Sequence, residues 1–163
     1  MSRVIRAATL ADLPAIKAMM RAFIDELNAI DEPEDVPDEA IDRIEELAFG
    51  AVSPCTILLC EHHGRPAGYL TYFWGMSMEG VSLALFVGDL FVAKGHRQSG
   101  VGRALMQGAR TIAADAGANQ VNWTVWRKNA AALAFYRCLG ARPYDEEILM
   151  TWPADPVAAK AGP

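Results

Sequence analysis

The sequence has few cysteines and no long apolar run. Its three cysteines, Cys55, Cys60 and Cys138, are odd in number and lack the spacing of metal ligands, so we assign them no disulfide and no metal site. No apolar run reaches the roughly 18 residues of a membrane-spanning helix, because Asp89 interrupts the stretch Val81–Val92. The N-terminus also lacks the apolar segment of a signal peptide. We therefore expect no metal, no membrane association and a cytoplasmic location.

Positive charge is also scarce, since 15 Lys and Arg residues face 20 Asp and Glu residues and the net charge is −5. Binding of nucleic acid needs a basic face for the phosphates, so we expect no nucleic-acid partner. The 163 residues, 52% of them apolar, are enough for one domain with its own core. We predict a single domain over residues 1–152 and a flexible tail, rich in Ala and Pro, over 153–163.

The most informative motif is a glycine-rich loop that follows an apolar strand. The letters FVGDLFV and then AKGHRQSGVGRAL predict a strand, a short loop and a helix. The first amides of a helix and its dipole attract anions, and Gly100 and Gly102 allow a phosphate to approach the backbone closely. Arg97, Ser99 and Arg103 add hydrogen-bond donors. The motif predicts a pyrophosphate site, although a plain helix start with two turn glycines fits the same letters.

Two common phosphate motifs do not match this loop. It has no Gly-Lys-Ser/Thr of a P-loop, and Leu105 stands where a dinucleotide-binding motif has a third glycine or alanine. A second motif lies downstream, where VNWTVWRKNAAALAFYRCLGARPY reads as an alternating strand, a break and an amphipathic helix that ends at Gly140. The order strand, loop, helix, strand, helix therefore accompanies the glycine-rich loop.

Together the two motifs resemble those of the GNAT superfamily of acyl-CoA-dependent N-acetyltransferases, from about Val4 to Trp152. The pyrophosphate loop of this family, Arg/Gln-x-x-Gly-x-Gly/Ala, is similar to Arg97 through Gly102. Its later signature is similar to Asn129, Ala132, Phe135, Tyr136, Leu139, Gly140 and Ala141. Two motifs in the family's order and spacing are more specific than either one alone.

The resemblance and the residue pattern predict an α/β (α+β) GNAT fold. We expect a mixed, mostly antiparallel sheet of six to seven strands, splayed in the middle and flanked by about four helices. The expected strands span residues 3–7, 56–61, 67–74, the stretch up to 92, 120–125 and 148–152. The expected helices begin after a near-capping box at Thr9, at Asp38, at Gly100 and at Ala130. A turn at His63-Gly64 is expected to join two strands as a hairpin.

The resemblance implies acetyl-CoA as co-substrate, without a metal. It implies that the strand before the loop binds the pantetheine arm through its backbone, and that the loop binds the pyrophosphate. The implied cofactor-binding residues are Leu90, Phe91, Val92, Arg97, Gln98, Ser99, Gly100, Val101, Gly102, Arg103 and Asn129. A backbone amide of Phe91 or Val92 would also hold the oxyanion, and loss of one such donor costs about 3–4 kcal/mol. For Asn129 a plain helix N-cap is an equal alternative.

Tyr136 is similar to the family's general acid, which protonates the departing CoA thiolate. A phenol with an ordinary pKa near 10 is protonated at neutral pH and can donate that proton. A core aromatic at helical spacing is the alternative for Tyr136. Asp89 is the second catalytic candidate, acting on the amine through water, and a structural carboxylate at the end of a strand fits it equally well.

The distribution of acidic residues suggests the class of the acceptor. Between Asp25 and Glu46 eleven residues are acidic and only Arg43 is basic, and the resemblance places this region at the acceptor site. The patterns around Tyr69, around Asp89 and from Asn122 to Asn129 look most like the diamine/spermidine acetyltransferase branch. Gly88 departs from that branch, which often has Glu there. An ordinary solvated acidic face is the alternative. The expected substrate-binding residues are Phe23, Glu26, Asp31 and Tyr72.

We therefore predict an N-acetyltransferase that transfers the acetyl group of acetyl-CoA directly to a primary amine, with a small cationic amine (a diamine, a polyamine or a lysine-like amine) as acceptor. The alternatives are a non-catalytic regulatory module that binds acetyl-CoA and a protein or peptide N-acetyltransferase. We also expect a homodimer.

Overall fold

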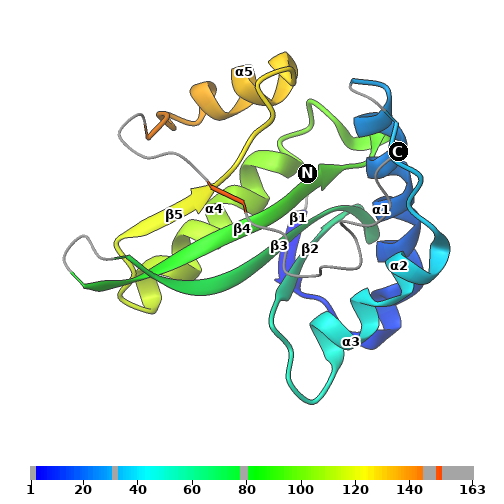
Figure 1. Ribbon diagram of the computed structural model, residues 1–163, viewed down its shortest axis with the longest axis horizontal. Coiled ribbons are helices and arrows are strands. Elements are labelled where there is room, and N and C mark those ends of the chain that lie inside the picture. The colour runs from blue at the N-terminus through cyan, green and yellow to red at the C-terminus, as the bar shows by residue number, and fades with distance from the viewer. Residues whose placement is uncertain (1–2, 31–32, 78–80, 145–149, 152–163) are drawn as a thin grey trace. The chain divides into compact units, whose positions relative to one another are not determined.

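The computed structural model describes residues 3–30, 33–77, 81–144 and 150–151. The chain divides into two compact units, Met1–Ala130 and Ala131–Pro163. The first unit contains the sheet and the helices α1 to α4 (Figure 1). Helix α5 (Ala130–Cys138) begins at the boundary and belongs almost entirely to the second unit. The single domain over residues 1–152 stays a prediction.

The sheet has five strands that follow one another in chain order. They are β1 (Arg3–Ala7), β2 (Thr56–His62), β3 (Arg65–Ser77), β4 (Ser82–Val92) and β5 (Gln120–Trp123). The first four pair antiparallel, and β5 pairs parallel with β4. The hairpin of β2 and β3 turns at His63 and Gly64, whose φ angles of 56° and 72° are those of a type I′ turn. The hairpin expected at these two residues is confirmed.

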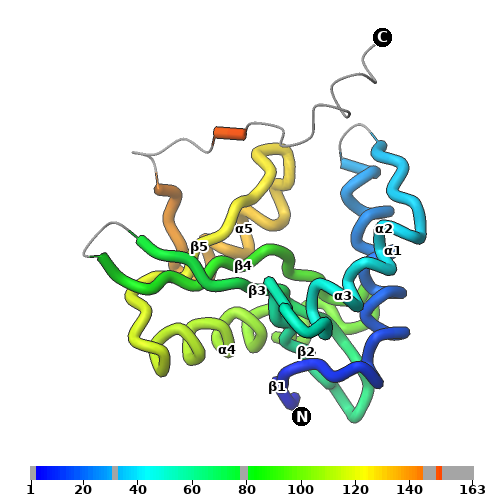
Figure 2. Tube along the Cα trace, turned by 60° about the horizontal axis from the view of Figure 1, so that its bottom comes forward, coloured from blue at the N-terminus to red at the C-terminus, as the bar shows by residue number. Residues whose placement is uncertain are grey.

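The helices of the first unit cover both faces of the sheet (Figure 2). They are α1 (Leu13–Asn28), α2 (Asp38–Asp42), α3 (Ile44–Phe49) and α4 (Val101–Asp115), with 3-10 turns at Leu10–Asp12 and Lys94–His96. The helix expected from Asp38 is interrupted at Arg43, and this break accompanies burial of both Ile41 and Ile44.

Two apolar layers flank the sheet. On one face α1 and α3 contribute Ile16, Met19 and Ile44 to a core cluster with Tyr69 of β3 and Phe91 of β4. On the other face the apolar side of α4 contacts the sheet. A side chain at Gly68 of β3 would touch Val101 of α4 there, and one at Gly108 of α4 would touch Ile5 of β1 and Leu58 of β2. Alternate residues of β3 therefore face α1 and α4 in turn.

The entry to α1 is fixed by charge as well as by packing. Asp12 accepts hydrogen bonds from the backbone and the hydroxyl of Thr9, so the expected capping box is confirmed. The Arg6 guanidinium of β1 donates to both oxygens of Asp12, at 2.7 and 2.8 Å, and to Glu61 of β2. These contacts hold the pKa of the Asp12 carboxyl well below its usual range, because they favour its charged form.

The α+β fold with a mixed sheet is confirmed, with one deviation in the number of strands. We expected six to seven, and the described residues form five. The strand expected at 148–152 lies largely outside the described residues, and Met150 and Thr151 have no regular secondary structure. The tail expected over 153–163 also lies outside the described residues.

Candidate active site

The sheet opens in the middle of β4. Opposite the single residue Thr71 of β3, β4 has two residues, Gly88 and Asp89, because Leu70 pairs with Leu90 whereas Tyr72 pairs with Val87. This extra residue is a β-bulge, which bends a strand and interrupts its pairing. Strand β5 pairs with β4 only as far as Val87. Beyond that point no described strand pairs with β4 on this side, and the predicted splay is present (Figure 1).

The loop after β4 ends as an anion-binding helix start. Gly100 is the N-cap residue of α4 and has φ 84° and ψ 7°, a left-handed conformation that glycine adopts at little cost. The first hydrogen bond of the helix runs from the amide of Ala104 to the carbonyl of Gly100, at 3.0 Å. The amides of Val101 and Gly102 therefore have no acceptor within the helix, and α4 is long enough for its dipole to favour an anion at this end.

The rear of the loop is held by side chains from β1 and β2. The Arg3 guanidinium donates to the carbonyl of Ser99, at 2.5 Å, and a Cβ at Gly100 would lie 3.4 Å from the same guanidinium. The Ser99 hydroxyl donates to the carbonyl of His96, and the ring of His96 contacts buried His62 through their Nδ1 atoms, at 3.2 Å. The sequence patterns contained no signal for Arg3 or His62 here.

Arg97 opens the loop motif, and its side chain lies toward α1. Its Nε donates to the carbonyl of Val92 at 3.0 Å, and its Nη2 lies 2.7 and 2.5 Å from the two carboxylate oxygens of Glu26. The guanidinium also lies 5.9 Å from the centre of the Phe91 ring. Glu26, expected at the acceptor site, is thus paired with a residue of the expected cofactor loop.

Asp89 lies on the face that α1 covers, at the bulge. Its amide donates to the Thr71 hydroxyl at 2.8 Å, and that hydroxyl lies 3.3 Å from its carboxylate. Burial raises the pKa of the Asp89 carboxyl, and the bond from Thr71 opposes part of this effect. A Cβ at Gly88 would lie 2.8 Å from the Thr71 hydroxyl, so Thr71 fills the space beside this glycine. The sequence had no signal for Thr71, because the bulge is not visible in it.

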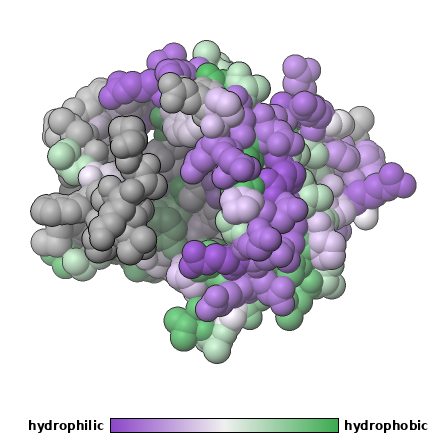
Figure 3. All heavy atoms as spheres, turned by 45° about the vertical axis from the view of Figure 1, so that its right-hand side comes forward, coloured by the Kyte–Doolittle hydropathy of each residue, from purple (hydrophilic) through white to green (hydrophobic). Residues whose placement is uncertain are grey.

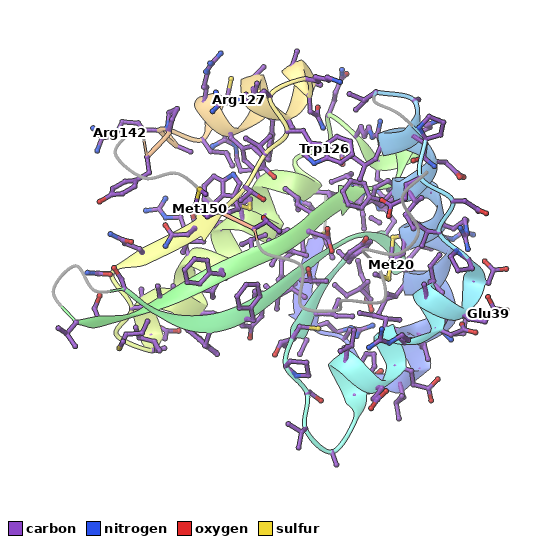
Figure 4. All side chains as sticks on the ribbon, in the orientation of Figure 1. Met20, Glu39, Trp126, Arg127, Arg142 and Met150 are labelled. Atoms are coloured by element: carbon purple, nitrogen blue, oxygen red, sulfur yellow. The ribbon has the colours of Figure 1, made fainter. Side chains whose placement is uncertain are left out.

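A cavity of about 420 Å³ lies between α1 and the end of β4. Its apolar lining includes Met19, Ala22 and Phe91, and its charged lining consists of Asp25, Glu26 and Lys94. Met20 packs against the same core from α1, whereas Glu39 of α2 is exposed (Figure 4). A second cavity, of about 520 Å³, is lined by α2 and α3 and contains no residue of β4 or of the loop.

The other expected substrate residues do not all meet at this cavity. Phe23 of α1 lies near it, because its ring centre is 5.7 Å from that of Phe91. Tyr72 is buried and, by the alternation of β3, lies on the α4 face, so the structure does not bring it together with Phe23 and Glu26. Asp31 lies outside the described residues.

Among the expected cofactor residues, only some expose a side chain. Gln98 and Arg103 are exposed at the loop and at the first turn of α4, whereas the Val101 side chain is buried against the sheet. Leu90 and Val92 are partly buried in the splayed part of β4.

The remaining expected residues are Asn129, at the end of the first unit, and Tyr136, in the second unit. Asn129 directly precedes α5, and its amide donates to the carbonyl of Trp126 at 2.9 Å. Tyr136 is a partly buried residue of α5, with its ring centre 5.2 Å from that of Phe135. Their roles as pantetheine ligand and general acid stay predictions.

Two further properties concern the described residues alone. No group of three or more His, Cys, Asp or Glu residues in this part of the chain is placed to hold a metal ion. No helix in the same ranges is both long and apolar enough to cross a bilayer.

The comparisons with known proteins agree with this geometry. The sequence model of the acetyltransferase (GNAT) family matches residues 18–141. A comparison with curated protein sequences finds no match. The family model covers most of the chain, including the bulge, the loop and α5. The chain therefore belongs to the GNAT family of acetyltransferases, and it is an enzyme of the transferase class.

Solved structures share the fold. An integron cassette protein from the mobile metagenome of V. cholerae has a TM-score of 0.75 at 21% identity, over 99% of this chain and 98% of that one. A probable acetyltransferase has a TM-score of 0.75 at 20% identity, over 95% and 99%. An aminoglycoside acetyltransferase from an uncultured soil metagenomic sample has a TM-score of 0.67 at 18% identity, over 94% and 95%.

The GNAT family uses acetyl-CoA as its co-substrate, and the residues of the first unit fit this molecule. The N-terminus of α4 suits the pyrophosphate, since Gly100 allows a close approach and Val101 and Gly102 offer amides. The splayed edge of β4 offers backbone groups to an amide-containing arm such as pantetheine. Bound acetyl-CoA supplies the acetyl group as a thioester.

Proposed function

We propose that the enzyme transfers the acetyl group from acetyl-CoA directly to the primary amine of a small cationic acceptor, as diamine/spermidine acetyltransferases do. The observation that carries this proposal is the cavity beside Phe91, because it joins an apolar floor to the carboxylate of Asp25 on α1, while the Glu26 carboxylate in the same lining pairs with Arg97. An alkyl chain that ends in an ammonium group matches both parts of this lining.

The charge around this cavity supports a cationic acceptor. Three acidic residues of the segment from Asp25 to Glu46 are neutralised by ion pairs, namely Glu26 by Arg97, Asp38 by Arg21 and Asp42 by Lys17. None of the ion pairs between described residues includes Asp25. Figure 3 shows hydrophilic side chains gathered over α1, α2 and α3. The electrostatic field of the acidic segment from Asp25 to Glu46 favours the approach of a cation.

The cavity also contains Lys94, which lies among the same lining residues. A positive charge there favours an acceptor that has its own carboxylate beside its amine, as lysine does. Lysine is therefore tested as an acceptor, together with putrescine and spermidine. The alternative is an enzyme that acetylates protein N-termini or peptides. Acetylation of a peptide with a free N-terminus, compared with that of the small amines, distinguishes the two.

The proposed chemistry uses one acid and one base. Asp89 accepts the proton of the amine through a water molecule as the nitrogen attacks the thioester carbonyl, and an amide of Phe91 or Val92 stabilises the oxyanion. The C–S bond then breaks, and Tyr136 protonates the leaving thiolate. The raised pKa of Asp89 makes it a stronger base than an ordinary carboxylate. Direct transfer needs no acyl-enzyme.

Asp25→Asn tests the acceptor site. We expect the KM for the acceptor to rise about three- to fivefold, with kcat and the Kd of acetyl-CoA unchanged, because Asp25 attracts the ammonium at close range. The wild-type KM should also rise with salt, and that of Asp25→Asn should rise less. Glu39→Gln is the matched control, since Glu39 is exposed on α2 and does not line this cavity. A salt-independent KM that Asp25→Asn leaves unchanged would refute the cationic-acceptor assignment.

A further inference from the structure

A buried tyrosine hydroxyl lies near the site without a described partner. Tyr69 of β3 is 0% exposed, and its hydroxyl forms no hydrogen bond with any group in the described part of the chain. Burial of a hydroxyl without a hydrogen bond is unfavourable, and such groups are rare in folded proteins. Phenylalanine would fill the same space without this cost. The hydroxyl therefore calls for an explanation other than packing.

The sheet register places this tyrosine beside Asp89. Tyr69 pairs directly with Phe91 of β4, and Asp89 is two positions before Phe91 on the same face. Such diagonal neighbours are typically about 7–8 Å apart, within reach of an aromatic side chain. Thr71, the next β3 residue on this face, holds both the amide and the carboxylate of Asp89. Burial and then the charge of Asp89 raise the pKa of the Tyr69 hydroxyl, which agrees with this placement.

We propose that the Tyr69 hydroxyl and the Asp89 carboxylate together hold the water molecule that takes the proton from the attacking amine, and that Thr71 positions Asp89. This inference rests on the proposed function. The water oxygen accepts the amine proton as the C–N bond forms, and a proton of the same water passes to Asp89. Tyr69 donates a hydrogen bond to that water and keeps its own proton. The proton on Asp89 later returns to solvent.

The arrangement assigns separate tasks to the three residues. Asp89 is partly exposed and can exchange its proton with solvent, whereas Tyr69 is fully buried and fixes the water from the core side. Thr71 is 6% exposed, and its hydroxyl accepts a hydrogen bond from the Asp89 amide at 2.8 Å and lies 3.3 Å from the Asp89 carboxylate, so it is a positioning residue. Among the described residues, the charge of Asp89 also raises the pKa of the Cys55 thiol, before β2, where burial is the larger cause.

Tyr69→Phe tests the proposal with activity and stability measured together. We expect kcat to fall about tenfold or more, because the water loses a fixed donor. We expect Tm to fall by about 2–4 °C, because the variant loses the hydrogen bond between the buried hydroxyl and the held water, worth about 1 kcal/mol. The pKa of the acid limb of kcat/KM should move upward, since the charged form of Asp89 loses support. Tyr144→Phe, which removes the same atom from an exposed side chain, should leave kcat and the pKa of the acid limb unchanged.

Variants of the other two residues complete the test. Asp89→Asn should remove the acid limb of the pH profile, and Thr71→Ser should restore the activity that Thr71→Val loses. A Tyr69→Phe enzyme with wild-type kcat and pH profile would overturn the proposal, and so would a Tm above that of the wild type, which is the result for a buried hydroxyl that bonds no water. If the wild type acetylates no amine, the proposed function fails. The inference is then still decided by Tm and by the pKa of Asp89, measured by carboxyl NMR with and without the Tyr69 hydroxyl.

Discussion

At the scale of single residues, Gly100 determines whether the loop accepts a pyrophosphate. Gly100→Asp should raise the Kd of acetyl-CoA about 100-fold or more, because it adds a negative charge where the anion must approach the amides of α4. Gly117→Asp is the matched control. Gly117 lies after the other end of α4 and also has a positive φ, 76°, with no atom near its missing Cβ.

Both substitutions impose the same kind of backbone strain, but only the side chain at Gly100 lies where the anion must approach, and its Cβ would also lie 3.4 Å from the Arg3 guanidinium. Isothermal titration calorimetry on both folded variants measures the difference. Equal Kd values for Gly100→Asp and the wild type would remove pyrophosphate binding from this loop.

A single substitution also tests the proposed role of Tyr136 as general acid. Tyr136→Phe should lower kcat about 100-fold while the Kd of acetyl-CoA changes little, because the hydroxyl is needed when the thiolate leaves. Steady-state kinetics and calorimetry on the same preparation measure both quantities. Phe135→Leu serves as a control for packing within α5, because the two rings contact each other. A turnover like that of the wild type would make Tyr136 a packing residue.

At the scale of elements, the Arg97–Glu26 pair ties α1 to the cofactor loop. Arg97→Ala removes the contacts to Glu26 and to the Val92 carbonyl, and it removes a positive charge beside the loop. We expect the Kd of acetyl-CoA to rise about threefold to fivefold, since a half-exposed ion pair contributes at most about 1 kcal/mol. Tm should change little for the same reason.

Glu26→Gln distinguishes two roles of Arg97. Arg97 can position the loop through its ion pair with Glu26 of α1, or it can bind the pyrophosphate, for which Glu26 would then compete. If Arg97 positions the loop through α1, Glu26→Gln should also weaken acetyl-CoA binding, by about threefold. We expect this result, because the guanidinium lies over Phe91 on the α1 face. Tighter binding in Glu26→Gln would show instead that Glu26 competes with the pyrophosphate for Arg97.

The elements also show how far the sequence predicts this protein. Strands β1 to β5, helix α1 with its capping box, the turn at His63-Gly64 and the glycine start of α4 follow from local patterns, and the structure contains all of them. These features depend on neighbours within a few residues. The break at Arg43 depends on tertiary packing, and the sequence pattern predicted one continuous helix there.

The site is less predictable, because its geometry depends on residues that are far apart in the sequence. Gly88 was interpreted as the loss of a glutamate, whereas the structure places the Thr71 hydroxyl in the space beside it. Glu26 was expected to bind the amine, and its partner Arg97 is 71 residues away. Neither contact leaves a periodic signal in the sequence.

At the scale of the whole molecule, the acidic and basic residues are unevenly distributed along the chain. Negative charge is concentrated in the segment from Asp25 to Glu46, where eleven acidic residues accompany a single arginine. This distribution favours a cationic acceptor and disfavours nucleic acid. The expected homodimer and cytoplasmic location stay predictions.

The central claim is that the chain acetylates a small cationic amine, with acetyl-CoA as the acetyl donor. The most direct measurement is the release of CoA thiol by the full chain across a panel of putrescine, spermidine, lysine, an aminoglycoside and a peptide with a free N-terminus, with mass spectrometry of the acetylated product. The account predicts one acetyl group per thiol released, fastest with a polyamine, a diamine or lysine. Thiol release no faster with any amine than with water alone, or a neutral or anionic best acceptor, would contradict it.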